Sequence, residues 1–384
     1  MCIRDSYYAV SWATAFRGDN PWLIYLLPVA GLAIIGLYKL LKMPKDRGTN
    51  LVISSIQTDE KVPFRMSALI FAGTAITHLF GGSAGREGAA LQVGGGIGCG
   101  MAKLIKADET TRKVMTLCAM SAVFAAVFGT PLTAAVFCIE VINVGIFYGA
   151  DFLPCIVSSL TAYLLAGALG ASPERYVIEW IPGLSAGNIG LTAVLAVACA
   201  VMSIIFCVVM HKTAHIMQRL IKNPYLRVMA GGALIIVLTL IFGRDYNGAG
   251  GNIIEEAISG NAVPYAFIVK LVFTAVTLGA GFKGGEIVPS FFVGATLGCV
   301  LGPLMGLPAS VSAAMCLVGV FCGVVNCPIA SVILGVELFG PGALPYFGLV
   351  CAVSFFLSGE YSLYSSQKLS YAKFEPRFIN HNAH

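Results

Sequence analysis

The sequence contains few charged residues: only 11% of its 384 residues are Asp, Glu, Lys or Arg. An average soluble domain has about 25% charged and roughly 45–50% apolar residues. This chain is 57% hydrophobic, and its mean hydropathy is +0.84. A soluble fold of this size could not bury so much apolar surface and still cover itself with polar groups. The composition therefore excludes an ordinary soluble enzyme and predicts a protein that crosses the membrane several times.

The sequence also lacks a large excess of positive charge, paired cysteine motifs and a cleavable signal peptide. The net charge is only +5 and the basic residues are scattered among loops, so no nucleic-acid partner is expected. The twelve cysteines form no CxxC pair, and eleven of them, from Cys99 to Cys351, lie in or beside apolar stretches. We expect free thiols, with no metal and no cofactor. No cleavable signal peptide is visible. Residues 7–16 resemble the end of a helix whose start is missing, which predicts an N-terminally truncated chain.

Long apolar runs are abundant, although they differ in length. A spanning helix needs about 20 apolar residues, and the long candidates are 22–41, 115–128, 153–169, 191–210, 228–242 and 266–278. The shorter candidates, interrupted by Gly and Pro, are 68–80, 89–105, 132–147, 287–305, 311–325, 329–339 and 344–357. Such segments predict an all-α polytopic membrane protein with broken and re-entrant helices that line a cavity. Basic loops at 39–47, 103–113 and 212–227 are expected to face the cytoplasm.

An internal repeat relates the two halves of the chain. The segment FGTPLTAAVFCIE at 128–140 resembles VNCPIASVILGVE at 325–337. In each, a proline (Pro131 or Pro328) begins the apolar run and a glutamate (Glu140 or Glu337) follows nine residues later. Corresponding broken segments in two halves point to a transporter site at the repeat interface. We expect one domain, 1–384, with halves of roughly 1–170 and 190–367, and we leave open whether the two glutamates cap loops or take part in transport.

The segment GGSAGREGAA at 81–90 precedes one of the short apolar helices. Glycines let the backbone approach a ligand, and a helix N-terminus presents free N–H groups and a positive dipole end to an anion. Glu87 lies in the first turn, where its own carboxylate could occupy such a site. A purely structural pairing with Arg86 is the alternative. Ionisable residues inside membranes are costly and usually functional, so we favour a functional role for Glu87.

The second half contains a matching loop, KGGEIVP at 283–289, in which Glu286 precedes another apolar helix. This loop predicts a second set of free N–H groups, with a re-entrant turn that binds nothing as the alternative.

The GxSxG pattern at 81–85, with Ser83 as its nucleophile, matches a hydrolase motif, but a helix-length run precedes it instead of a strand. The GxGxxG pattern at 279–284 fails for the same reason. His211 and His215 lack a third metal ligand and are expected on the surface. No enzyme is predicted.

Taken together, these residues resemble the CLC family of chloride channels and anion/proton antiporters from about residue 12 to 367. The motifs are GREG at 85–88, GGxxxP at 284–289 and the two Pro…Glu helices. The resemblance implies an inverted repeat and a homodimer with one pore per subunit. It also implies that Glu87 is the gating, proton-transferring glutamate. The hydroxyl of Tyr364, in preference to that of Tyr361, would then contact the central anion.

Several departures from chloride-type members resemble the fluoride-exporting branch of the family, which exchanges fluoride for protons. GTNLV at 48–52 replaces GSGIP, and GGEIVP at 284–289 replaces GGIFxP. Ala89 stands where a proline is usual, and Val141 where chloride-type antiporters have a second glutamate. Val288 departs from the branch itself, which often has threonine there.

Fluoride is small and strongly hydrated, so its site needs several N–H or O–H donors. The anion-binding residues expected are Thr49, Asn50, Gly85, Arg86, Gly88, Ile287, Val288 and Tyr364. Ionised Glu87 would compete for the anion position and, once protonated, leave it with a proton. The prediction is a fluoride/proton antiporter that lowers cytoplasmic fluoride, with fluoride or chloride, protons and the lipid bilayer as partners. It would lie in a prokaryotic plasma membrane. A chloride channel or chloride/proton antiporter is the alternative.

Overall fold

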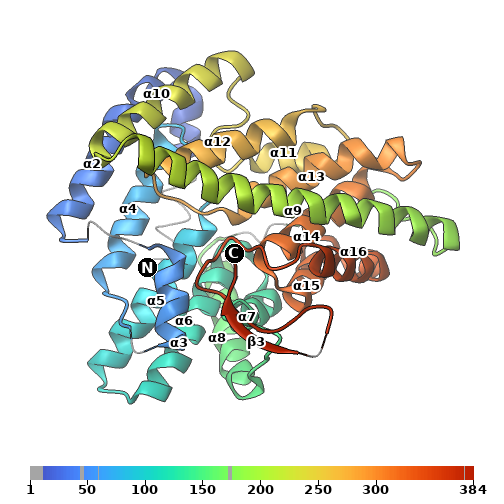
Figure 1. The fold of residues 1–384 in the computed structure, drawn as a ribbon, viewed down its shortest axis with the longest axis horizontal. Helices are drawn as coiled ribbons and strands as arrows, with labels where there is room; N and C mark the ends of the chain where they lie inside the picture. The colour runs from blue at the N-terminus through green and yellow to red at the C-terminus, as the bar shows by residue number, and fades with distance from the viewer. Residues whose placement is uncertain (1–11, 44–46, 59, 172–174, 376) are drawn as a thin grey trace.

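The computed structural model describes residues 12–43, 47–58, 60–171, 175–375 and 377–384, most of them in helices of very different lengths (Figure 1). Cys2, part of the helix end expected at 7–16 and part of the basic loop expected at 39–47 lie outside these residues, whereas 12–19 are helical. The first half contains η1 (Pro21–Leu26), α2 (Leu27–Leu40), α3 (Thr49–Gln57), α4 (Arg65–Leu79), α5 (Glu87–Leu104), α6 (Glu109–Phe128), α7 (Pro131–Glu140) and α8 (Gly149–Ala168). The second contains α9 (Ala186–Leu220), α10 (Pro224–Phe242), α11 (Gly251–Ile258), α12 (Ala266–Ala280), α13 (Ile287–Leu304), α14 (Ala309–Val325), α15 (Pro328–Phe339), η2 (Pro341–Ala343) and α16 (Leu344–Leu357).

Helix length separates two kinds of element. Among the described residues, six helical segments are long and apolar enough to cross a membrane: Pro21–Leu40, α6, α8, α9, α10 and α13. In contrast, α7 has 10 residues, which is about 15 Å and half of the roughly 30 Å hydrocarbon core. Pro131 and Pro328 occupy the first positions of α7 and α15, where a missing N–H leaves no helix bond unmade. The prediction of an all-α membrane fold with broken helices is confirmed.

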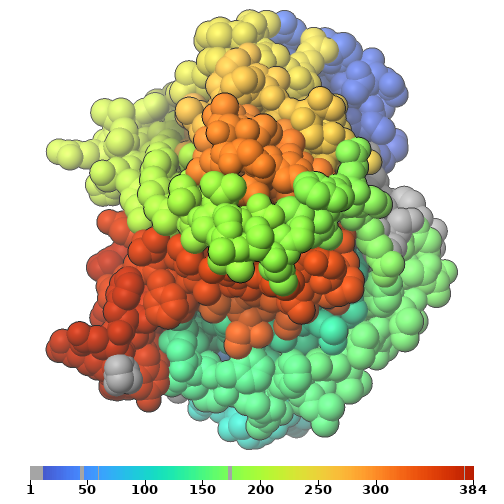
Figure 2. All heavy atoms as spheres, turned by 90° about the vertical axis from the view of Figure 1, so that its right-hand side faces the viewer, coloured from blue at the N-terminus to red at the C-terminus, as the bar shows by residue number. Residues whose placement is uncertain are grey.

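The longest helix, α9, has 35 residues and packs across α12, α14 and α16. Figure 2 shows it as a band between the orange residues above it and the red C-terminal part below it. The contact depends on small residues, because a Cβ added to Gly323 of α14 would lie 2.4 Å from the Ser203 hydroxyl of α9. Small residues of this kind let membrane helices approach closely. The eleven cysteines of the described residues are all free, as expected.

The sequence prediction fails at the polar ends of helices. The segment 132–147 is not one helix: α7 ends at Glu140, and β1 (Asn143–Val144) follows. β1 pairs in parallel with β2 (Lys368–Tyr371), which pairs antiparallel with β3 (Phe378–Asn382). This small sheet joins the C-terminal tail to the first half of the chain. It is too short to produce an alternating pattern that could be recognised.

The search for apolar runs also missed α3 and α11, which carry polar residues on one side. The basic loops expected at 103–113 and 212–227 are largely helical, since α6 begins at Glu109 and α9 continues to Leu220. An apolar run stops at its first charged residue, whereas a helix continues for as long as its polar side is solvated. Segment 22–41 is also divided, into η1 and α2.

Candidate functional site

The two glycine-rich loops meet each other at the centre of the fold. Gly85 N–H donates to the Gly285 carbonyl at 2.8 Å, and Gly285 N–H donates to the Gly85 carbonyl at 2.7 Å. A Cβ on Gly285 would lie 2.4 Å from the Gly88 nitrogen, so only glycine permits this approach. Because α5 begins at Glu87 and α13 at Ile287, the bridge brings two helix N-termini together. The arrangement concentrates free N–H groups and two positive dipole ends in one place.

Threonines support both loops in a matching way. Ser83 N–H donates to Thr277 Oγ1 at 3.1 Å, and Lys283 N–H donates to Thr77 Oγ1 at 3.2 Å. The Ser83 hydroxyl lies 3.1 Å from the hydroxyl of Thr274 in a fully buried position. Ser83 is therefore bonded to threonine and not to a histidine, which agrees with setting the hydrolase pattern aside.

Glu87 is the first residue of α5, and only 1% of it is exposed. Its Oε1 lies 3.6 Å from Arg86 Nε. Both residues line a cavity of about 510 Å³, called here the Arg86 cavity, to which Arg17, His78 and Val288 also contribute. Anion-binding sites at helix N-termini hold the anion close to the free N–H groups. The carboxylate of Glu87, at the start of α5 and beside arginines, occupies this position. Glu87 can therefore act as a resident anion that a transported anion would replace.

Tyr364 lines a second cavity of about 160 Å³, called here the Tyr364 cavity. Its other polar lining residues are Arg47, Thr49, Asn50, Gln92, Lys283 and Glu286. The Tyr364 hydroxyl is buried and has no hydrogen-bond partner among the described residues. Leaving a buried hydroxyl unpaired costs about 1–3 kcal/mol, so this hydroxyl is available to donate to a bound anion. The two cavities share no lining residue, and both border the bridged glycine loops.

Side chains from two other helices, α3 and α9, contact the loop that carries Tyr364. Asn50 Oδ1 accepts from Ser366 N–H at 2.9 Å. The side-chain N–H groups of Asn50 are therefore the part of this residue that would donate to an anion. His211 Nε2 lies 3.3 Å from the Leu363 carbonyl. The expectation that His211 is a surface residue of a basic loop is therefore wrong: it lies in α9 and contacts this loop, because α9 extends beyond its apolar run.

Tyr361, the tyrosine that was not favoured, is 38% exposed, whereas Tyr364 is 1% exposed. Thr49 Oγ1 lies 3.5 Å from the Gly88 carbonyl and 3.4 Å from Gln92 Nε2. Thr49 therefore lies against the start of α5, close to the bridge. This places the beginning of α3 beside the first two turns of α5.

The expected amide donors differ in availability. Gly85 N–H is already bonded to Gly285, so Gly85 would contribute by allowing the loops to meet. Ile287 and Val288 open α13 and are buried, and the first turn of a helix has no intrahelical acceptors for its N–H groups. Val288 borders the Arg86 cavity. The roles of these residues stay predictions.

The repeat glutamates cap each other's helices. Glu140, at the end of α7, accepts from Ile329 N–H at 3.1 Å and from Ala330 N–H at 2.9 Å. Glu337, in α15, accepts from Leu132 N–H at 3.0 Å and from Thr133 N–H at 2.9 Å. A carboxylate at a helix N-terminus satisfies orphan donors and stabilises the dipole. Of the two roles left open for these glutamates, the contacts support capping.

Two polar residues of the region were missed. Lys270 is fully buried in α12 and donates to the carbonyls of Tyr246 and Gly248 at 3.1 and 2.7 Å. It is the single charged residue in this apolar helix, a signal that marks functional or structural sites in membranes. Gln92 is the single amide side chain of α5, in an otherwise small and apolar stretch. Either could have been found by looking for polar residues inside apolar runs.

Comparisons with known proteins agree with this geometry. The profile of the family described as voltage gated chloride channel matches residues 30–359. A chloride/fluoride channel protein of Pseudomonas syringae pv. tomato is 36% identical over 369 residues, covering 94% of this chain and 82% of that protein. The crystal structure of a CLC-type fluoride/proton antiporter matches with a TM-score of 0.93 and 31% identity, covering 96% of this chain and 94% of that one.

A slow cyanobacterial chloride/proton antiporter has the same fold, with a TM-score of 0.75, 16% identity and 93% and 92% of the two chains covered. The profile match and the relative that is 36% identical both establish the family. The resemblance inferred from the sequence motifs is therefore confirmed. The chain is a multi-pass integral membrane protein that belongs to the voltage-gated chloride channel (CLC) family.

Proposed function

We propose that this protein is a fluoride/proton antiporter that exports fluoride from the cytoplasm in exchange for protons. The observation that carries the proposal is the placement of Glu87, a buried carboxylate at the first turn of α5 where two helix N-termini meet. A carboxylate there is both an anion mimic and a group that binds a proton. Similarity to a chloride/fluoride channel protein and to a fluoride/proton antiporter structure supports fluoride as the anion.

The anion would move between the two cavities. Each carries cationic side chains, Arg47 and Lys283 in the Tyr364 cavity and Arg17 and Arg86 in the Arg86 cavity, which attract anions from either side. Between them, the Tyr364 hydroxyl and the amides that open α13 would replace the water around fluoride. Hydrogen bonds to a small anion are strong, so a compact set of donors favours fluoride.

Coupling would follow from competition for one position. When ionised, Glu87 occupies the anion site at the start of α5. When protonated, it loses the negative charge that the helix N-termini attract, so it leaves the site and the anion takes its place. Each departure of the side chain moves a proton, and each return displaces an anion. Protons and fluoride therefore travel in opposite directions.

We also propose the assembly and location of the protein. The basic ends of α5 and α6 would face the cytoplasm by the positive-inside rule. The protein would be a homodimer with one pathway per subunit, in a prokaryotic plasma membrane, and its two repeat halves would be roughly 1–170 and 190–367. These statements depend on membership of the family and on the distribution of charge.

The test is transport by the purified full chain in proteoliposomes loaded with potassium fluoride. Valinomycin starts efflux while external fluoride and pH are recorded together. We expect fluoride efflux with a rise in external pH, because protons enter as fluoride leaves, and a protonophore should abolish the pH change. Chloride efflux equal to fluoride efflux would contradict the proposed selectivity. Fluoride efflux without any pH change would indicate a channel.

A loop exchange tests the basis of selectivity. Replacing residues 48–52 (GTNLV) by the chloride-type sequence GSGIP removes the Asn50 side chain and the Thr49 methyl from the Tyr364 cavity. We expect the ratio of fluoride to chloride flux to fall. An unchanged ratio would show that these residues do not set the preference.

A further inference from the structure

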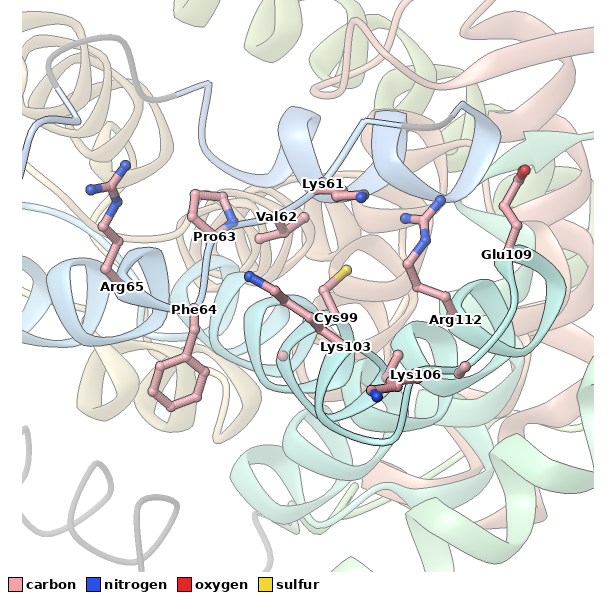
Figure 3. A pocket seen from close by; sticks show the side chains of 13 residues that line it. Lys61, Val62, Pro63, Phe64, Arg65, Cys99, Lys103, Lys106, Glu109 and Arg112 are labelled. Carbon is pink, nitrogen blue, oxygen red and sulfur yellow. The ribbon is translucent and has the colours of Figure 1, made fainter.

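The largest of the three cavities described here lies outside the transport site. It has a volume of about 920 Å³ and lies between the segment that leads into α4, the end of α5 and the start of α6 (Figure 3). The proposed transport function assigns no role to it.

The lining of this groove is strongly cationic. Lys61, Arg65, Lys103, Lys106 and Arg112 all contribute. The one acidic lining residue, Glu109, forms an ion pair with Lys113, which is outside the lining. Among the described residues, no ion pair engages the five cations. Like charges that line one groove repel one another, so an anion with several negative oxygens would relieve an unfavourable arrangement.

The side chains also converge on one space. Figure 3 shows the amino groups of Lys61 and Lys103 and the guanidinium of Arg112 around Cys99, whereas Phe64 points away from them. One nitrogen of Arg112 contacts the carbonyls of Ser55 and Glu60 at 3.3 and 3.4 Å. Because a guanidinium has five N–H donors in a fixed fork, the remaining donors can bind phosphate or carboxylate oxygens. Amines and a guanidinium around a pocket are the chemistry that recognises phosphate.

Exposed apolar side chains accompany the cations. Phe64 lines the groove and is 64% exposed. Leu104 and Ile105, which are 83% and 62% exposed, lie in the sequence between the lining residues Lys103 and Lys106. A surface with exposed large apolar side chains beside lysines matches the boundary between acyl chains and headgroups. We propose that this groove binds a phosphate group, that of an anionic lipid, whose headgroup contacts Lys61, Lys103, Lys106 and Arg112 and whose acyl chains lie along Phe64 and Leu104.

The proposal is independent of fluoride transport, so binding alone tests it. The full chain is purified and its bound lipids are counted by native mass spectrometry after titration with phosphatidylglycerol or zwitterionic phosphatidylcholine. A separate arm measures binding of pyrophosphate by calorimetry. The groove variant is Lys103→Gln with Lys106→Gln, and the matched control is Lys212→Gln with Lys222→Gln, two exposed lysines elsewhere. Arg112 is left intact because it also contacts Ser55 of α3.

We expect wild type and the control to retain phosphatidylglycerol in preference to phosphatidylcholine. The groove variant should lose about 30-fold in affinity, roughly fivefold for each lysine, while eluting from size exclusion as wild type does. Equal retention of phosphatidylglycerol by the groove variant and wild type would overturn the proposal. Pyrophosphate binding that depends on the two lysines, without retention of phosphatidylglycerol, would overturn the lipid assignment and leave a site for soluble phosphate.

Discussion

Gly85 and Gly285 are 200 positions apart in the sequence and exchange two backbone hydrogen bonds of 2.8 and 2.7 Å. This pair joins the two halves of the chain at the point where α5 and α13 begin. Thr77 and Thr277 support the same point from opposite halves. The candidate anion site therefore exists only when both halves are folded against each other.

The first prediction concerns this bridge. Gly285→Ala should destabilise the protein by about 1–3 kcal/mol, as overpacking of a close contact does, because the new Cβ would meet the Gly88 nitrogen at 2.4 Å. Gly190→Ala in α9 is the control, since nothing lies within 4 Å of its Cβ. Thermal unfolding in detergent measures the difference. Equal melting temperatures for the two variants would contradict the tight bridge.

The second prediction concerns the reciprocal caps. Glu337→Ala removes the acceptor of Leu132 and Thr133, and each amide left unsatisfied costs about 1–3 kcal/mol. We expect a lower melting temperature with an unchanged number of protons moved per fluoride in the molecules that stay folded. Glu256→Ala, an exposed position in α11, should change neither quantity. A changed ratio with normal stability would assign Glu337 a part in transport.

The third prediction concerns the Tyr364 hydroxyl. Tyr364→Phe should slow fluoride transport about tenfold or more, the value of a hydrogen bond to a charged group. Thermal stability should not fall, because the hydroxyl has no hydrogen-bond partner among the described residues to lose. Tyr361→Phe should leave both properties unchanged. A loss of stability in Tyr364→Phe without a transport defect would show that the hydroxyl is structural.

The fourth prediction concerns pH and Lys373, which follows β2 in the C-terminal tail. Its ammonium donates to Asn326 Oδ1 and the Phe355 carbonyl at 2.6 and 2.7 Å. Burial lowers the pKa of Lys373 to about 8, whereas the unfolded chain keeps a pKa of about 10.4. Between these values the unfolded state binds more protons, so this residue makes stability rise as pH increases from about 8 to 10.4.

Lys373→Met removes the titrating group. Melting temperatures of wild type and variant are compared between pH 7.5 and 10. We expect the wild type to gain stability relative to the variant as the pH rises through this window. Parallel curves would mean that the pKa of Lys373 is not lowered in the folded protein.

Local sequence signals predict the places where the broken helices begin. Glycine, proline and the first charged residue mark the starts of α5, α7, α13 and α15, because these residues act on the backbone within one turn. The apolar runs likewise locate most of the spanning helices. The glycine-rich motif also predicts a role for Glu87, whereas Tyr364 was expected only from the resemblance to the CLC family. The structure places the two residues in the linings of two separate cavities.

Contacts between distant segments could not be predicted in this way. Nothing near Gly85 specifies Gly285 as its partner, and nothing near Glu140 specifies the start of α15. The same holds for His211, whose contact with Leu363 spans 152 positions. The short helix α3 was also missed because Thr, Asn and Ser interrupt its apolar side, although tertiary packing buries most of it. Local sequence patterns therefore predict individual helices and loops. The site depends on contacts between segments far apart in the sequence, which those patterns do not predict.

The most direct test of the account is Glu87→Gln in the proteoliposome assay. Glutamine has the size of glutamate but cannot ionise or carry a proton, so it can neither compete as an anion nor couple the two ions. Glu256→Gln is the matched control. We predict that a fluoride gradient drives proton uptake in wild type and in the control but drives none in Glu87→Gln. Proton uptake at the wild-type ratio in Glu87→Gln would contradict the assignment of Glu87 as the coupling residue.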